Sequence, residues 1–410
     1  MIINQYIKNF ENLGMGMFVH FGLYSILKNG EWVMDQHKIP LEEYKKNAKM
    51  FCPEKDWAEQ LVKTAKNGGA KYITLTTRHH EGFSLYDTCG LSDYDAPHYI
   101  GRDLVREFVD ACNAEGIIPC FYHTTLDWSM ASFYDDFPAY LNYLRKSVEV
   151  LCRNYGKIGS FWFDGNWSKK DVDWEEDALY QMIRSYQPET IIINNTGLEK
   201  LGERGNIHID SVTFERGKPF EINPPDAPKY LASEMCEVLG SHWGYAEHDL
   251  FLKSPKEIIE TLCQCRRFGA NLLINVGLKE NGYVSDVEQA YFSVLGKWVF
   301  VYGEAIRCPR PSHIVIENNE KDFILRDGKS LYLFCHNLGM SADPNVSRIT
   351  NPAKYVDSFK LPDEKILSAK WMDNGESLSF SNEDGMIHMK TAPFLYGTNY
   401  VVRVAKIYLE

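Results

Sequence analysis

Short apolar runs alternate with amphipathic stretches along most of this chain. In the amphipathic stretches apolar residues recur every three or four positions, which is typical of helices with one buried face. The short runs are rich in β-branched and aromatic residues, as in strands covered on both sides. Strands are expected at residues 15–20, 71–76, 116–122, 159–163, 190–194, 206–210, 230–234 and 270–275. Helices are expected at residues 56–67, 101–115, 138–155, 175–186, 254–268 and 284–301.

This alternation predicts the fold class. Strands that alternate with helices pair in parallel, and eight such strands favour closure into a (β/α)8 TIM-like barrel. No clear helical pattern follows the sixth and seventh expected strands, so the barrel is expected to be irregular there. We predict that residues 1–306 form this catalytic barrel, with the helix at 284–301 closing it.

The pattern changes after residue 306. Short alternating strands are expected at 322–325, 330–335, 386–389 and 400–404, with turn signals at Asp327-Gly328 and Asn374-Gly375. Such closely spaced strands with tight turns predict an antiparallel β-sandwich. We assign residues 307–410 to this second domain.

Composition and charge narrow the possible function. A net charge of -12 argues against nucleic-acid binding, which needs a positive surface. No apolar run reaches the roughly 18 residues of a membrane span, and the first ten residues contain no apolar signal segment, so a cytoplasmic protein is expected. Aromatic residues make up 13% of the chain, and sugar sites collect such residues because the C–H face of a pyranose packs on flat rings.

Polar and aromatic residues follow the expected strands at their carboxyl ends. Barrel enzymes place their active sites at that end. A rim with several histidines, acids and tryptophans suits a polyhydroxylated ligand, which needs many hydrogen-bond partners and a stacking face. The residues concerned include His20, Glu31, Trp32, His79, His80, Tyr122, Asp164, Glu215, Glu234 and Asn275.

Asp164 is the clearest candidate for chemistry. It directly follows the apolar run Phe161-Trp162-Phe163, where a carboxylate is costly to bury unless it has partners or a task. A glycosidase needs two carboxyl groups, one ionised and one with a raised pKa. Glu215, Glu234 and Glu237 all follow the middle strands, and their spacing does not decide which of them is the second group.

The adjacent pair His79-His80 raises a metal alternative. Neighbouring residues on a strand point to opposite faces, so both can hardly bind one ion unless the strand has ended. The spaced motif His-Glu-x-x-His is absent. We therefore expect no metal and assign these histidines to sugar hydroxyls or to orienting the nucleophile.

Several segments resemble the α-L-fucosidases of glycoside hydrolase family 29. These are MGMFVHFGLYS, GEW, GAKYITLTTRHHEGFSLYDT, GRDLVREFVDACNAEGI, FWFDGNW, SHWGY and GANLLINVGLKENG, between about Met15 and Tyr302. HHEGF and WFDG, each after a strand, are highly specific in combination. The resemblance also implies a barrel followed by a β-sandwich.

The resemblance assigns roles residue by residue. It implies that Asp164 is the nucleophile and that the fucose pocket includes His20, Glu31, Trp32, His79 and His80. Thr213-Phe214-Glu215 matches the family's Thr-x-Glu acid/base segment, although Phe214 replaces the usual Pro. Glu234 matches another family Glu, preceded here by Ser233 where Trp is common. Tyr122, Trp162, Glu234 and Trp243 complete the expected substrate-binding set.

The resulting hypothesis is a retaining, exo-acting α-L-fucosidase that needs no cofactor. It would hydrolyse terminal α-L-fucosyl linkages of oligosaccharides or glycoconjugates through a covalent intermediate on Asp164. Three alternatives stay open: a glycosidase for galactosyl groups on the same barrel, a carbohydrate-binding protein with a disabled site, and a zinc hydrolase. The presence of both carboxylates argues against the second, and the absence of zinc-ligand spacing argues against the third.

Overall fold

The computed structural model describes residues 2–343, 345–346 and 355–410. The chain divides into two compact units, one of Met1–Lys253 with Asn271–Ser293 and the other of Ser254–Ala270 with Val294–Glu410. Helix α12 (Asp286–Tyr302) therefore crosses from one unit to the other. The domain boundary at residue 307 stays a prediction.

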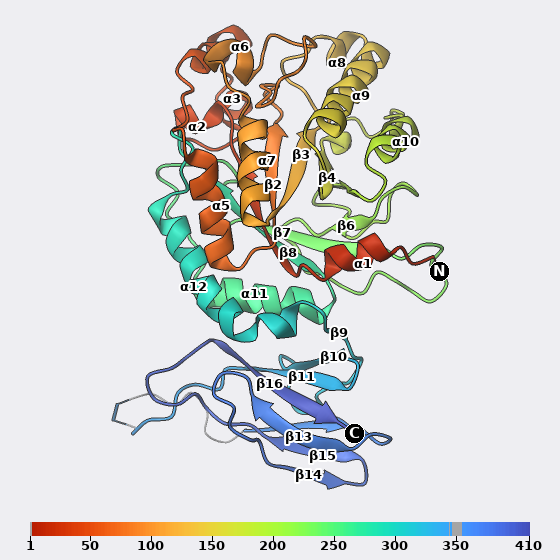
Figure 1. Ribbon diagram of the computed structural model, residues 1–410, viewed down its shortest axis with the longest axis vertical. Helices are drawn as coiled ribbons and strands as arrows, with labels where there is room; N and C mark the ends of the chain where they lie inside the picture. The colour runs from red at the N-terminus through yellow and green to blue at the C-terminus, as the bar shows by residue number, and fades with distance from the viewer. Residues whose placement is uncertain (1, 344, 347–354) are drawn as a thin grey trace. The chain divides into compact units, whose positions relative to one another are not determined.

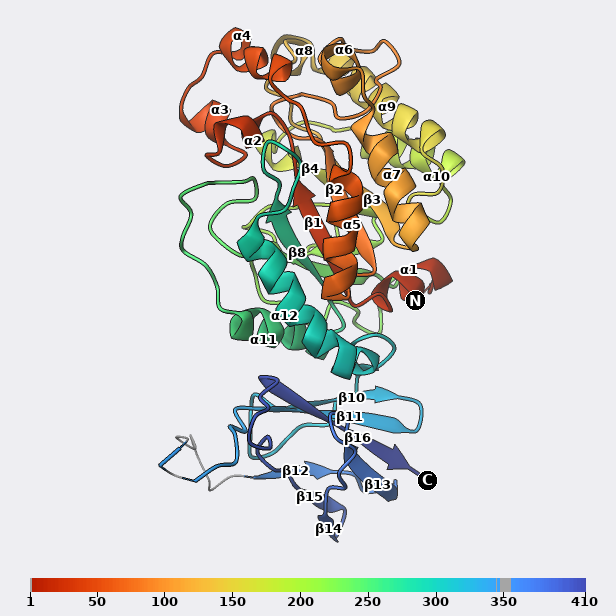
Figure 2. The ribbon, with the colours of Figure 1, turned by 60° about the vertical axis from the view of Figure 1, so that its left-hand side comes forward.

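The first unit contains a closed barrel of eight parallel strands, as the sequence predicts (Figure 1). β1 pairs in parallel with both β2 and β8, and this second pairing closes the barrel (Figure 2). The strands are β1 (Met15–His20), β2 (Tyr72–Arg78), β3 (Ile118–Thr124), β4 (Ser160–Asp164), β5 (Ile191–Asn194), β6 (Ser211–Thr213), β7 (Ala232–Glu237) and β8 (Asn271–Gly277).

The sixth strand differs from its prediction. Residues 206–210 form a turn and irregular backbone, and β6 begins at Ser211. The Asn206 side chain accepts a hydrogen bond from the His208 backbone N–H, a local turn that competes with an extended strand. The Asp210 carboxylate forms ion pairs with Arg184 and Lys229. The described residues between β6 and β7 form no helix, as expected. The same expectation for the seventh strand is wrong, because α11 (Pro255–Arg267) lies between β7 and β8.

Helices follow most other strands, and their ends obey simple capping chemistry. In α7 the Asp103 carboxylate accepts from the Arg106 N–H, which satisfies one of the unpaired donors of the first turn. α5 buries Trp57, Leu61 and Ala65 along one stripe. The α-helices of this unit are α1 (Gln5–Glu11), α2 (Tyr24–Leu27), α3 (Val33–Gln36), α4 (Leu41–Tyr44), α5 (Trp57–Gly68), α6 (Ala96–Ile100), α7 (Leu104–Glu115), α8 (Ser132–Asp135), α9 (Phe137–Asn154) and α10 (Glu176–Tyr186).

Short helices gather at the carboxyl ends of the barrel strands. α2, α3 and α4 follow β1, α6 follows β2 and α8 follows β3. The helices α3, α6 and α8 lie at the top of the view in Figure 1. The 3-10 helices of the unit are η1 (Lys45–Lys49) and η2 (Asn166–Ser168). These connections surround the end of the barrel where the candidate residues lie.

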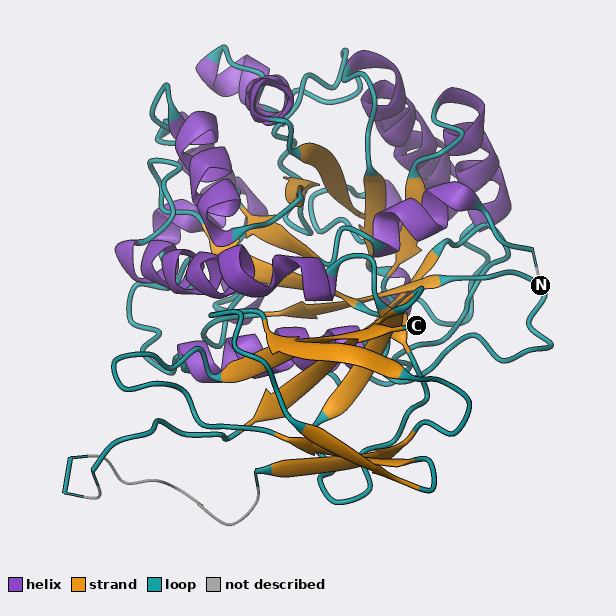
Figure 3. Ribbon diagram, turned by 60° about the horizontal axis from the view of Figure 1, so that its bottom comes forward, coloured by secondary structure: helices purple, strands orange, loops and turns teal. Residues whose placement is uncertain are grey.

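The second unit contains the predicted antiparallel C-terminal strands (Figure 3). A five-stranded sheet has the order β13-β16-β11-β10-β9, and a three-stranded sheet has the order β12-β15-β14. Residues from both sheets, such as Leu333 and Ile387, share one apolar core, as in a β-sandwich. The strands are β9 (Arg310–Pro311), β10 (Phe323–Asp327), β11 (Ser330–His336), β12 (Val356–Lys360), β13 (Ile366–Trp371), β14 (Phe380–Glu383), β15 (Met386–Lys390) and β16 (Val402–Leu409). The unit also holds α11 (Pro255–Arg267) and η3 (Gly303–Ile306).

Candidate active site

A cavity of about 880 Å³ opens at the carboxyl ends of the barrel strands. It extends over the loops that follow β4 and β5, so most of its wall comes from that side of the barrel. The residues that line it include Phe18, His20, Trp32, His79, His80, Tyr122, Trp162, Asp164, Trp167, Asn195, Glu215 and Trp243.

Asp164 is the last residue of β4, and its carboxylate has donors on both oxygens. Trp167 Nε1 donates to Oδ1 at 2.7 Å, and Tyr122 Oη donates to Oδ2 at 3.0 Å. His80 Nε2 lies 3.5 Å from Oδ2. Gly165 then turns the chain at a φ of +124°, and a Cβ at this position would lie 2.5 Å from the Leu126 backbone nitrogen. Glycine at 165 therefore lets the strand end with the carboxylate in the cavity.

Glu215 lies two residues beyond the end of β6 and is linked to Asp164 through Asn195. The Asn195 amide nitrogen donates to Glu215 Oε2 at 2.7 Å and to Asp164 Oδ1 at 3.2 Å. Two carboxylates are thus bound to one nitrogen atom. Of the three glutamates that the sequence left open, the structure brings Glu215 to Asp164.

The surroundings move the pKa values of the two carboxyl groups in opposite directions. Burial raises the pKa of Glu215 to about 7, and the nearby Asp164 adds to the effect. Burial also opposes ionisation of Asp164, but hydrogen bonds from His80, Trp167 and Tyr122 outweigh it and lower the pKa of that carboxyl. At neutral pH the pair can therefore supply one carboxylate and one acid.

His20, His79 and His80 meet at one side of the cavity. The His79 ring lies 4.2 Å from that of His80 and 5.5 Å from that of His20, measured between centroids. His20 Nδ1 is 2.7 Å from Asn275 Oδ1, and His80 Nδ1 is 2.7 Å from Thr124 Oγ1. Burial lowers the pKa of His20 to about 3 and holds that of His79 well below its usual range. Neutral imidazoles of this kind can both donate to and accept from hydroxyl groups.

Indole rings form a wall beside these histidines, with Trp32 5.5 Å from His80 and Trp243 5.4 Å from His20, measured between ring centroids. Trp32 stacks with Trp167 at 6.1 Å between centroids and contacts Trp128 edge-on at 5.0 Å. Trp162 and Trp243 both lie near Phe18 at the base of the cavity. The site thus combines polar donors and acceptors with flat apolar faces, the combination that sugar binding needs.

Glu31 lies behind this wall. Its Oε2 atom accepts hydrogen bonds from the backbone N–H groups of Trp243 and Gly244, at 3.0 and 2.7 Å. The side chain is buried and is absent from the residues that line the cavity. In this structure Glu31 therefore holds the segment that carries Trp243.

Glu234 lies deeper than its sequence position suggests. Its carboxylate accepts from Tyr72 Oη and, at 3.1 Å, from Trp162 Nε1, and it does not line the cavity. The expected strand ended at residue 234, whereas β7 continues to Glu237, so Glu234 sits inside the barrel. Glu237 is paired with Lys253 at 3.2 Å. The structure brings neither glutamate to Asp164.

Two hydrogen-bond donors to Asp164, Trp167 and Asn195, were not predicted from the sequence. Trp167 belongs to the segment FWFDGNW, whose last residue received no role. Asn195 directly follows β5, and a polar residue at a strand end is the signal that identified the other candidates. Examining the end of the fifth strand in the same way would have found it.

Comparison with known proteins identifies the family. A family model described as "Alpha-L-fucosidase" matches residues 3–304, which includes the whole barrel. The chain belongs to this family. It is therefore a glycoside hydrolase with α-L-fucosidase activity, and fucosylated compounds are its substrates.

Individual relatives of this fucosidase agree with that assignment. Human tissue alpha-L-fucosidase is 26% identical over 369 residues, covering 80% of this chain and 75% of its own. The solved structure of alpha-L-fucosidase isoenzyme 1 from Paenibacillus thiaminolyticus is 28% identical, with a TM-score of 0.84 and 99% coverage of both chains. A family 29 alpha-L-fucosidase from Bacteroides thetaiotaomicron, solved as a trapped covalent intermediate with 2-fluoro-fucosyl fluoride, is 22% identical, with a TM-score of 0.83 and coverage of 99% and 96%. This last likeness concerns the fold alone.

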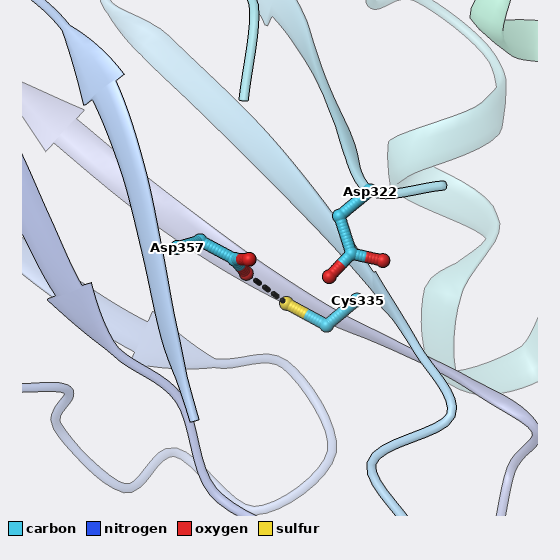
Figure 4. A group of neighbouring side chains, drawn as sticks. All are labelled: Asp322, Cys335 and Asp357. Carbon is cyan, nitrogen blue, oxygen red and sulfur yellow. Dashed lines mark hydrogen bonds between the residues drawn. The ribbon is translucent and has the colours of Figure 1, made fainter. Parts of the chain in front are cut away.

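Two further features of the fucosidase bear on partners and metals. Within the described ranges, no helix has the length and apolar character needed to cross a membrane. Among the same residues, one group of three potential metal ligands has its ligand atoms within 4.8 Å of one another: Asp322, Cys335 and Asp357 of the second unit (Figure 4).

Hydrogen bonds within the protein account for this buried group. Cys335 Sγ donates to Asp357 Oδ2 at 3.4 Å, and Asp322 accepts from the His336 N–H at 2.7 Å and from Asn319 Nδ2 at 2.7 Å. Burial, with the neighbouring Asp322, raises the pKa of Asp357 to about 7. A proton held by Asp357 therefore removes the repulsion between the Asp357 and Asp322 carboxyl groups.

Proposed function

We propose that this fucosidase is a retaining, exo-acting enzyme in which Asp164 is the nucleophile and Glu215 is the general acid/base. The observation that carries the proposal is the pair of carboxyl groups on one Asn195 nitrogen, with oxygens at 3.2 and 2.7 Å. Retaining glycosidases keep their carboxyl groups about 5 to 5.5 Å apart, and two groups bound to one donor atom are compatible with that separation. The opposite pKa shifts of the two groups fit the two roles.

In the first step an Asp164 oxygen attacks the anomeric carbon of a terminal α-L-fucosyl group. The bond to the glycosidic oxygen breaks, and Glu215 gives its proton to that oxygen. The products are a fucosyl ester on Asp164, the free alcohol of the leaving sugar and the Glu215 carboxylate. Trp167 and Tyr122 hold the Asp164 oxygens before the attack.

In the second step the Glu215 carboxylate takes a proton from water, and the water oxygen attacks the same anomeric carbon. The ester bond breaks, Asp164 leaves as a carboxylate and Glu215 is protonated again. Two inversions give α-L-fucose, so the configuration is retained. No cofactor enters this sequence of bond changes.

The other residues serve substrate binding. His20 and His79 offer ring nitrogens to the fucose hydroxyls, and His80, whose Nε2 lies 3.5 Å from Asp164 Oδ2, orients the nucleophile. The Trp32, Trp162 and Trp243 rings and Tyr122 provide apolar faces for the sugar ring and its C5 methyl group. The cavity reaches Phe18, a buried residue of β1, and we expect it to take a terminal sugar rather than an internal one. The Bacteroides thetaiotaomicron relative, described as a trapped covalent intermediate, supports the ester step by analogy.

The direct test uses the same trapping compound. After incubation with 2-fluoro-fucosyl fluoride, mass spectrometry should show one added 2-fluoro-fucosyl group, and peptide mapping should place it on Asp164. NMR of the first product formed from an aryl α-L-fucoside should show the α-anomer. A first product of β-configuration, or a label on another residue, would refute the proposed mechanism.

A further inference from the structure

Asn195 occupies a position between the two carboxyl groups of the proposed mechanism. It directly follows β5, is buried, and donates from one amide nitrogen to Glu215 Oε2 and to Asp164 Oδ1. We propose that Asn195 is a positioning residue that couples the nucleophile to the acid/base. The inference rests on the roles proposed above for Asp164 and Glu215.

The orientation of this amide is determined by its own oxygen. Asn195 Oδ1 accepts from Thr213 Oγ1 at 3.1 Å and from the Gly197 N–H at 3.3 Å. Because both neighbours are donors to this atom, the oxygen faces them and the NH2 group faces the carboxyl groups. A rotated amide would place its oxygen against the ionised Asp164 carboxylate and leave both donors without an acceptor.

The same short strand supplies the orienting group and carries the acid/base. Thr213 is the last residue of β6, and Glu215 follows two residues later. β6 pairs with β5 through Ser211 and Ile193, so Asn195 and Glu215 leave neighbouring strands in the same direction. A displacement of β6 would therefore move the Thr213 hydroxyl and the Glu215 carboxyl together.

The two N–H groups of the amide match the movement of charge during the reaction. Before the first step the negative charge lies on Asp164, and after it the charge lies on Glu215. One N–H points to each group, so a donor is present at the charged oxygen in both states without rearrangement of the protein. A hydrogen bond to the ionised form lowers a carboxyl pKa, and the Asn195 contact opposes the effect of burial at Glu215 in this way.

The test compares Asn195→Ala and Asn195→Leu with the unchanged enzyme by pH profiles of kcat/KM on an aryl α-L-fucoside. Leucine keeps the volume but lacks the donor, so one variant can replace the other if one fails to fold. Loss of the donor should raise both carboxyl pKa values. The acidic and basic limbs should both move to higher pH by about one unit, and kcat/KM should fall about ten- to hundredfold.

Asn194→Ala is the matched control. Its amide nitrogen donates to Glu176 Oε1 at 2.8 Å and to Tyr180 Oη at 3.0 Å, not to either proposed catalytic carboxylate. Both limbs should therefore keep their positions in this variant. Limbs that also stay in place in the folded Asn195 variants, or that move to lower pH, would overturn the proposal, even if kcat/KM falls.

A failure of the mechanism itself would look different. If Asp164 or Glu215 does not have its proposed role, then Asp164→Ala would stay active or Glu215→Gln would keep the basic limb of the profile. The other case is that Asp164→Ala and Glu215→Gln behave as expected but the pH profiles of the Asn195 variants do not shift. Then only the coupling role of Asn195 is wrong.

Discussion

Asp164 and Glu215 share a single hydrogen-bond donor, the side-chain nitrogen of Asn195, which lies 3.2 Å from Asp164 Oδ1 and 2.7 Å from Glu215 Oε2. Two carboxylates this close repel each other, so one of them holds its proton to higher pH. The surrounding donors decide which one. Trp167 and Tyr122 stabilise the ionised form of Asp164, whereas burial raises the pKa of Glu215 to about 7.

Replacement of Asp164 by Ala or Gly should abolish turnover of every substrate. The variant lacks the atom that attacks the anomeric carbon, so kcat should fall by several orders of magnitude, equivalent to roughly 4 kcal/mol or more. Azide should restore part of the activity from the vacated space and give β-fucosyl azide, measurable by NMR. Asp171→Ala is the control, because Asp171 is an exposed acid in the same loop. Near-normal activity of the Asp164 variants would refute the nucleophile assignment.

Replacement of Glu215 by Ala should make the rate depend on the leaving group. Oligosaccharides need protonation of a poor leaving alcohol and should lose far more activity than aryl fucosides, whose phenolate leaves readily. Azide should attack the ester intermediate and give the retained α-fucosyl azide. Glu221→Ala, an exposed acid between β6 and β7, should behave like the unchanged enzyme. An equal loss on both substrate types would argue against Glu215 as the acid/base.

Treatment with EDTA should leave activity unchanged. The three histidines of the cavity are expected to bind sugar hydroxyls or to orient the nucleophile, and His20 and His80 already use one ring nitrogen on Asn275 and Thr124. The measurement is kcat/KM before and after dialysis against EDTA, together with elemental analysis of the protein. A stoichiometric metal lost in parallel with activity would restore the metal-hydrolase alternative.

Most of the barrel could be predicted from the sequence. The periodicity of apolar residues marks the strands and helices, and the polar residues at the strand ends mark the site. The bounds of β1 were predicted without error, and the residues at or just beyond the carboxyl ends of β1, β2 and β4 led to His20, His80 and Asp164. The sixth strand was misplaced because the Asn206 side chain forms a local turn, which hydrophobic patterning does not reveal.

The sequence did not predict how deep in the barrel Glu234 lies. β7 continues three residues beyond Glu234, and Glu234 pairs in register with Asn271, the first residue of β8. A carboxylate at that level faces the barrel interior. The distances that join Asp164, Asn195 and Glu215 depend on three separate strands, so spacing along the chain could not give them.

Glu234 should lower stability as its carboxyl group ionises. Burial raises its pKa from 4.5 to about 7, while Tyr72 and Trp162 donate to it and oppose the shift. A raised pKa means that the folded state binds the proton more tightly than the unfolded state, so this contribution to stability is complete below about pH 4.5. It declines as the pH rises to about 7 and is lost above that value. At about 1.36 kcal/mol per pKa unit, the loss corresponds to about 3 kcal/mol.

Glu234→Gln tests this ionisation directly, because glutamine keeps the shape and an acceptor oxygen but cannot ionise. The free energy of unfolding, measured with urea between pH 4.5 and 8.5, should fall less steeply with pH in the variant than in the unchanged enzyme. Other buried acids, such as Glu288 with a pKa raised to about 7, are common to both proteins and cancel in the difference. The variant should also show no leaving-group dependence beyond that of the unchanged enzyme. Parallel stability curves would show that Glu234 does not titrate in this range, and a selective loss on oligosaccharides would transfer the acid/base role from Glu215 to Glu234.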